Sequence, residues 1–238
     1  MNTLMVLGLG VLLGMQHATE ADHLAAVATL VGRERSLVRG LRLGVAWGCG
    51  HTLTLLIVAG GVGLLGWVIS PELAGRFEQV VGAMLIGLGA SLGWRLWRER
   101  FHFHGHVHPG AGAHFHGHAH GQHGKGARMP QQRHAAEAHR HEHRLPARSL
   151  LVGMVHGLAG SAALVLIVGQ SLPGTASQLA YIALFGLGSI IGMALLSGAV
   201  AFSVNLSARR LTGLHGVFNG VVAAVSVGLG LRLLLVWP

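Results

Sequence analysis

Long apolar segments alternate with short polar connections along most of the chain. The six segments cover approximately residues 2–31, 43–69, 80–96, 150–172, 179–206 and 214–237. A helix needs about 20 apolar residues to cross roughly 30 Å of hydrocarbon, and each segment reaches or approaches that length. The first is apolar from Leu4 to Met15 and again through Leu24–Val31, so we expect one helix near Asn2–Val31. The pattern predicts an all-α integral membrane protein with about six transmembrane helices.

A long polar tract divides these segments into two groups of three. It predicts three regions: a first three-helix unit over residues 1–98, a loop over 99–148, and a second three-helix unit over 149–238. Thirteen of the 18 histidines lie in the loop, many in alternation with glycine. Such tracts bind metal through their composition and need no packed core. We therefore expect the loop to be disordered without metal and to act as an accessory chelator.

The two three-helix units share short motifs in the same order. Since each unit has an odd number of helices, the second would be inverted relative to the first, as in many secondary transporters. Such repeats place the substrate site near the middle of the bilayer, between the halves. The matches, at offsets of 139, 138 and 137 residues, are Gly14–His17 with Gly153–His156, Gly48–His51 with Gly186–Ser189, and Leu92–Leu96 with Leu229–Leu233.

Composition and charge agree with this topology. Only 11% of residues are charged and 51% are hydrophobic, whereas a soluble domain carries about 25% charged residues. The net charge of +9 gathers in the first, third and fifth connections. Positive connections face the cytoplasm, so we expect these three inside a bacterial-type plasma (inner) membrane and both termini outside. Topology accounts for the excess of positive charge, which argues against a nucleic-acid partner.

Ionisable side chains within transmembrane segments are costly and mark functional sites. Imidazole and carboxylate groups together suit first-row divalent metals, so six of these residues are candidate metal ligands. Two more, at matching positions of the repeat, are candidates for carrying protons, for supporting the ligands or for pairing with each other. The metal candidates are His17, Glu20, Asp22, His23, His51 and His156, and the other two are Glu78 and His215.

The densest cluster lies in the first segment. At about 100° per residue, His17, Glu20 and His23 form a slanting stripe on one side of a helix, and Asp22 points away from it. A straight helix cannot aim all four at one ion. Either the helix unwinds here, as at many transporter sites, or Asp22 supports a metal ligand on another helix.

These residues also resemble a known family. The run from His17 to His23 resembles the His-x-x-x-x-Asp-His signature of the nickel/cobalt transporter family, and Gly50-His51-Thr52 is similar to its second motif. The resemblance implies a nickel or cobalt permease whose first-motif residues recognise the ion. Better-known members have eight transmembrane helices and acidic motifs in the second half, whereas residues 156–161 contain no acid. The chain is therefore similar to a shorter branch, the nickel permeases of urease-accessory type.

Other classes fit the sequence less well. The chain has neither the His-Glu-x-x-His motif of metalloproteases nor a nucleophile elbow, so we expect no enzyme and no cofactor. A membrane-bound metal sensor or storage protein is an alternative, but it leaves the intramembrane histidines unexplained. Moving a divalent ion inward gains about 4.6 kcal/mol per 100 mV, which favours uptake; export coupled to proton exchange is the other alternative. Cytoplasmic nickel acceptor proteins are candidate partners.

Overall fold

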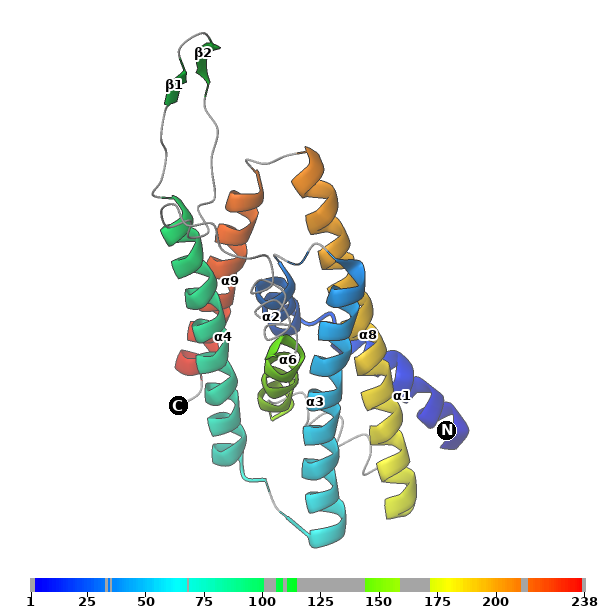
Figure 1. The fold of residues 1–238 in the computed structure, drawn as a ribbon. Coiled ribbons are helices and arrows are strands. Elements are labelled where there is room, and N and C mark those ends of the chain that lie inside the picture. The colour runs from blue at the N-terminus through cyan, green and yellow to red at the C-terminus, as the bar shows by residue number, and fades with distance from the viewer. Residues whose placement is uncertain are drawn as a thin grey trace, which may run out of the picture.

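The computed structural model describes most of the chain, and the described part is helical apart from two short strands (Figure 1). It describes residues 3–32, 34, 36–67, 69–100, 106–108, 111–114, 144–158, 172–210 and 214–236. The helices are α1 (Thr3–His17), α2 (Ala21–Val31), α3 (Leu37–Leu65), α4 (Pro71–Arg100), α6 (Arg144–His156), α8 (Thr175–Arg210) and α9 (Leu214–Val236).

Four of these helices are long and apolar enough to cross a membrane. They contain the candidate spans Leu37–Leu65, Pro71–Arg98, Thr175–Leu206 and Gly216–Leu235. This confirms the prediction of a helical membrane protein. The other two predicted spans differ: the first is divided between α1 and α2, and the fourth is described only as far as Leu158, because residues 159–171 lie outside the described part.

The expectation of one continuous helix near Asn2–Val31 is wrong. Helix α1 ends at His17 and α2 begins at Ala21, with Glu20 in an extended conformation (φ −62°, ψ 151°). The Thr19 hydroxyl donates to the Gln16 carbonyl over 2.6 Å, and His17 Nδ1 lies 2.9 Å from Glu20 Oε1. Residues 16–31 contain no glycine or proline, so the composition does not predict a break here. The two side-chain contacts stabilise it.

Glycines bring the helices into close contact in two matching ways. Helix α1 packs against α8, where a side chain at Gly14 would overlap the Phe185 carbonyl. Helix α6 packs against α3, where a side chain at Gly153 would overlap the Trp47 carbonyl. In both pairs the contacts advance together along the two sequences, so α1 runs parallel to α8 and α6 runs parallel to α3.

The long helices pair in antiparallel fashion, as their colours show in Figure 1. Along α3 and α8, Gly40 faces Ala201 and Gly48 faces Ile190. In the second pair, α4 and α9, the two chains approach closely where Gly82 meets Gly230. Figure 1 places the N- and C-terminal ends of the described chain toward the same end of the bundle.

Two short strands lie in the histidine-rich loop, away from the helices in Figure 1. Strand β1 (His106–His108) pairs antiparallel with β2 (Ala111–His114), with His106 opposite His114. The disorder expected for the loop without metal stays a prediction, and most of the loop falls outside the described part. Helices α4 and α6 also extend past the predicted loop boundaries, to Arg100 and from Arg144.

Candidate metal site

Four buried imidazoles converge at the break between α1 and α2. His17 is the last residue of α1, His23 lies in the first turn of α2, His51 near the middle of α3, and His156 at the end of α6. His17 is 5% exposed and the other three are 1% exposed or less. Segments far apart in sequence thus bring together four metal-binding side chains inside the helical bundle.

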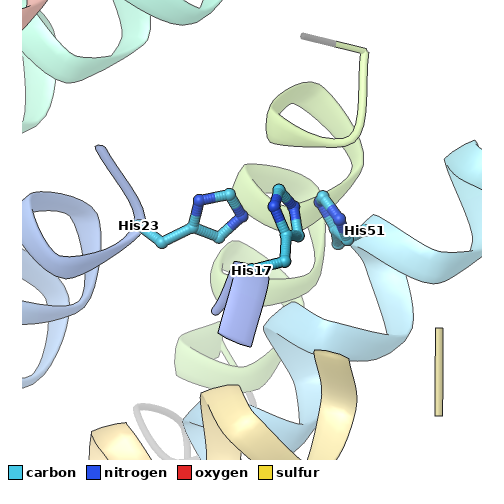
Figure 2. A group of neighbouring side chains, drawn as sticks. All are labelled: His17, His23 and His51. Carbon is cyan, nitrogen blue, oxygen red and sulfur yellow. The ribbon is translucent and has the colours of Figure 1, made fainter. Parts of the chain in front are cut away.

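Three of these rings form one compact group. The ring centroids of His17 and His23 are 4.3 Å apart, and those of His51 lie 5.2 Å and 5.3 Å from them. One ring nitrogen from each residue lies within 4.8 Å of the others, and Figure 2 shows the three side chains pointing toward one another. This spacing suits three ligands around a single ion.

Unsatisfied nitrogens in the group point to a ligand. Among the described residues, His23 Nε2 and both ring nitrogens of His51 are buried without a hydrogen-bond partner. Leaving a buried polar group unpaired costs about 1–3 kcal/mol, so native proteins rarely tolerate several such groups side by side. A metal ion bound by these nitrogens would remove that cost.

Asp22 joins two of the histidines. Its Oδ1 lies 3.0 Å from His23 Nδ1 and accepts from the His23 backbone N–H over 2.8 Å, and its Oδ2 lies 3.0 Å from His156 Nε2. A carboxylate accepts from ring nitrogens that carry hydrogen, which leaves His23 Nε2 and His156 Nδ1 with free lone pairs. Carboxylates orient metal-binding histidines in this way. Both options left open by the helix geometry therefore hold: the helix breaks, and Asp22 reaches a histidine on another helix.

Asp22 also belongs to a second group of candidate ligands. It combines with His23 and His156, and one ligand atom from each lies within 4.8 Å of the others. His23 is common to both groups. The second group includes a carboxylate and joins α2 to α6, whereas the first contains only imidazoles.

Glu20 supports the site from its edge. Its side chain is 50% exposed, and it contacts His17 Nδ1 rather than entering either group of candidate ligands. The structure therefore places Glu20 beside a candidate ligand, where it contacts the His17 ring.

Sequence reasoning missed Trp47, which forms one wall of the site. Its side chain is 1% exposed, and its ring lies 5.5 Å from that of His23 and 5.6 Å from that of His156. On α3 it precedes His51 by four residues, and residues at that spacing share a helix face. That spacing was the signal available in the sequence.

Glu78 and His215 do not come together. Helices α4 and α9 are antiparallel with Gly82 beside Gly230, so Glu78 lies near one end of the pair. Residue 215 is fifteen residues before Gly230, about 22 Å along the helix at 1.5 Å per residue. Glu78 is half-buried on α4, and the side chain of His215 lies outside the described part.

Comparison with known proteins gives one informative result. No protein-family model and no solved structure matches the chain. The urease accessory protein UreH of Bacillus sp. (strain TB-90) is 32% identical over 231 residues, which cover 96% of this chain and 90% of that protein. Identity at this level over nearly the whole of both proteins shows common descent, and the chain therefore belongs to the family of the urease accessory protein UreH.

Proposed function

We propose that this protein carries Ni²⁺, Co²⁺ or both across the membrane and that it works in uptake. The observation that carries the proposal is the group formed by His17, His23 and His51, buried among long apolar helices. Within it, His23 Nε2 and both ring nitrogens of His51 have no hydrogen-bond partner among the described residues. Imidazole is a preferred ligand of nickel and related ions. The relative is named for urease, an enzyme that depends on nickel, and the motif from His17 to His23 resembles that of nickel/cobalt transporters.

The cluster has the chemistry that a transport site requires. Three neutral imidazoles would replace part of the water around the ion, and the Asp22 carboxylate at the edge would offset part of its charge. The ring nitrogens come from α1, α2, α3 and α6 rather than from one rigid element. Small relative movements of these helices would therefore change the number of ligands around the ion and allow its release.

An inverted repeat is part of the proposal. The contact between Gly14 and Phe185 matches that between Gly153 and Trp47 after residue numbers are shifted by 139 and 138. Exchanging the halves in this way also exchanges α1 with α6 and α3 with α8, which agrees with the two parallel pairs. This correspondence supports two inverted three-helix units with the histidine cluster where they meet.

The same arrangement supports an orientation in the membrane. Helices α3 and α6 run parallel, and α4 runs opposite to α3. The N-terminal ends of α3 and α6 and the C-terminal end of α4 therefore lie at the same end of the bundle, and all three carry basic side chains. We propose that this end is cytoplasmic and that both termini face outside, because cytoplasmic connections are enriched in Lys and Arg. The residues are Arg39 and Arg42 in α3, Arg95 and Arg98 in α4, and Arg148 in α6.

Flux into sealed vesicles containing the purified protein tests the proposal. Wild-type protein should accelerate the entry of radioactive nickel, and His51→Ala should remove that acceleration. Cys49→Ala is the matched control, because Cys49 lies on the same helix two residues earlier and is exposed. Metal binding without flux in the wild type would instead favour a sensor or storage protein, and lower nickel content in expressing cells would favour export.

A further inference from the structure

We propose that the cluster holds two overlapping ion positions that share His23, and that the ion passes from one to the other during transport. The first position is formed by His17, His23 and His51, and the second by Asp22, His23 and His156. This inference rests on the proposed function and specifies how the site works.

The rings are arranged on two sides of His23. The His23 ring lies 5.3 Å from that of His51 and 4.1 Å from that of His156, whereas the His51 and His156 rings are 6.2 Å apart. The two nitrogens of His23 also differ in their surroundings. Nδ1 is 3.0 Å from Asp22 Oδ1, while Nε2 is buried without a partner among the described residues. His23 thus offers one nitrogen to each position.

A neutral imidazole can bind only one ion, because its second nitrogen carries the proton. With the proton on Nδ1, bonded to Asp22, His23 presents Nε2 to the first position. At the second position the ion would take His23 Nδ1 and His156 Nε2. Each ring would then lose the proton that this nitrogen donates to Asp22 and gain one on its other nitrogen. No net proton is gained or lost, and only one of the two positions is occupied at a time.

The two positions differ in charge and in the helices they join. The first provides three neutral ligands, from α1, α2 and α3. None of them offsets the charge of a bound divalent ion, so only groups beyond the ligands can do so. The second provides the carboxylate of Asp22 directly and adds His156 of α6. Burial of an uncompensated charge is costly, so passage to the second position lowers that cost. It also brings His156, from the second half of the chain, into contact with the ion.

Fluorescence of Trp47 gives a measure of the two positions in the full-length protein. Its ring lies within 5.6 Å of His23 and His156, so a paramagnetic Ni²⁺ ion in the cluster should quench it. The parent protein for this experiment carries phenylalanine at the other four tryptophans and must retain nickel flux. The substituted residues are Trp67, Trp94, Trp97 and Trp237.

Variants then separate the positions. His51→Gln disables the first and His156→Gln the second, and the glutamine amide at 156 can still donate to Asp22. Each single variant should retain saturable quenching by Ni²⁺ but lose flux into vesicles. The double variant and His23→Gln should lose both. Cys49→Ala should behave as the parent.

Two results would overturn the inference. Loss of saturable quenching in either single variant would mean one site that needs all four histidines. Flux at the parent rate in either single variant would mean that its position does not lie on the path. Absence of flux in the wild-type protein would count against the transport function alone, because the quenching of the variants still decides between one position and two.

Discussion

The chain uses histidine in two contrasting regions. In the bundle, each of four histidines is placed by a helix, and Asp22 contacts two of them, one through each carboxylate oxygen. The four are His17, His23, His51 and His156. In the loop, thirteen histidines occur in repetitive runs with glycine. The bundle therefore offers a defined candidate position for an ion, whereas the loop offers many histidines without a defined arrangement in the sequence.

The difference shows what the fold adds to the same side chain. Trp47 and Phe185 lie against the buried rings, with Phe185 5.3 Å from His17, so these imidazoles are shielded from water and their nitrogens meet only selected partners. The loop histidines gain no such selection from their sequence, since one can replace another. The comparison predicts that changes in the bundle stop transport and that changes in the loop alter capacity.

The largest effect should come from His23→Ala. His23 belongs to both groups of candidate ligands, so its loss leaves neither complete and should reduce nickel uptake to the level of cells without the protein. Leu24→Ala is the matched control, because Leu24 is adjacent on α2 and 45% exposed. The measurement is initial uptake at equal membrane expression. Normal uptake in His23→Ala would mean that the buried histidines are not the transport site.

Asp22→Asn should have the next largest effect. Loss of a carboxylate that orients metal-binding histidines typically weakens metal affinity by about 10–100-fold, and Asp22 orients two of them. Glu20→Gln should have a smaller effect, because the Glu20 side chain is half exposed and, within the described part of the chain, contacts only His17. Nickel titrations of the two purified variants make the comparison. An equal loss of nickel affinity in both variants would contradict the larger role assigned to Asp22.

Much of the candidate site could be predicted from sequence because its candidate ligands lie in apolar segments. An ionisable residue stands out there, which identified His17, Asp22, His23, His51 and His156. The break after His17 could not be predicted, since residues 16–31 contain neither glycine nor proline and the local sequence favours a helix. The side-chain contacts that accompany the break, between Thr19 and Gln16 and between His17 and Glu20, are seen only in the structure. The division of ligands into two groups depends on ring distances between helices, which no spacing along the chain reveals.

Gly14→Leu tests the packing of α1 against α8, which supports the buried histidines. A side chain at residue 14 would overlap the Phe185 backbone on α8, whereas nothing lies within 4 Å of a side chain at Gly8 on the same helix. Overpacking costs typically about 1–3 kcal/mol, so Gly14→Leu should melt at a lower temperature in detergent than Gly8→Leu. Equal melting temperatures would show that α1 does not depend on this contact.

The smallest effect on uptake should follow replacement of the thirteen loop histidines by asparagine. The bundle is unchanged, so most of the initial uptake rate should remain, while the nickel bound per purified protein should fall. In the wild type, binding to the loop should weaken as pH falls through about 6.5, because protonated imidazole cannot bind metal. If the loop variant stops uptake as completely as His23→Ala, the loop histidines do more than set the amount of nickel bound, and the contrast between bundle and loop is wrong.

The interruption between α1 and α2 has a consequence for biogenesis. At 1.5 Å per residue, the 15 residues of α1 cover about 22 Å and the 11 residues of α2 about 16 Å, so neither crosses the hydrocarbon alone. An aspartate within an apolar segment also disfavours insertion, by about 2.5–3.5 kcal/mol at the centre of a spanning helix. Contacts of Gly14 and Gly188 secure α1 against α8, which begins only at Thr175. Helices α1 and α2 are therefore synthesised well before the helix that stabilises them, and a nascent chain completes its candidate ion site only after α8 has been made.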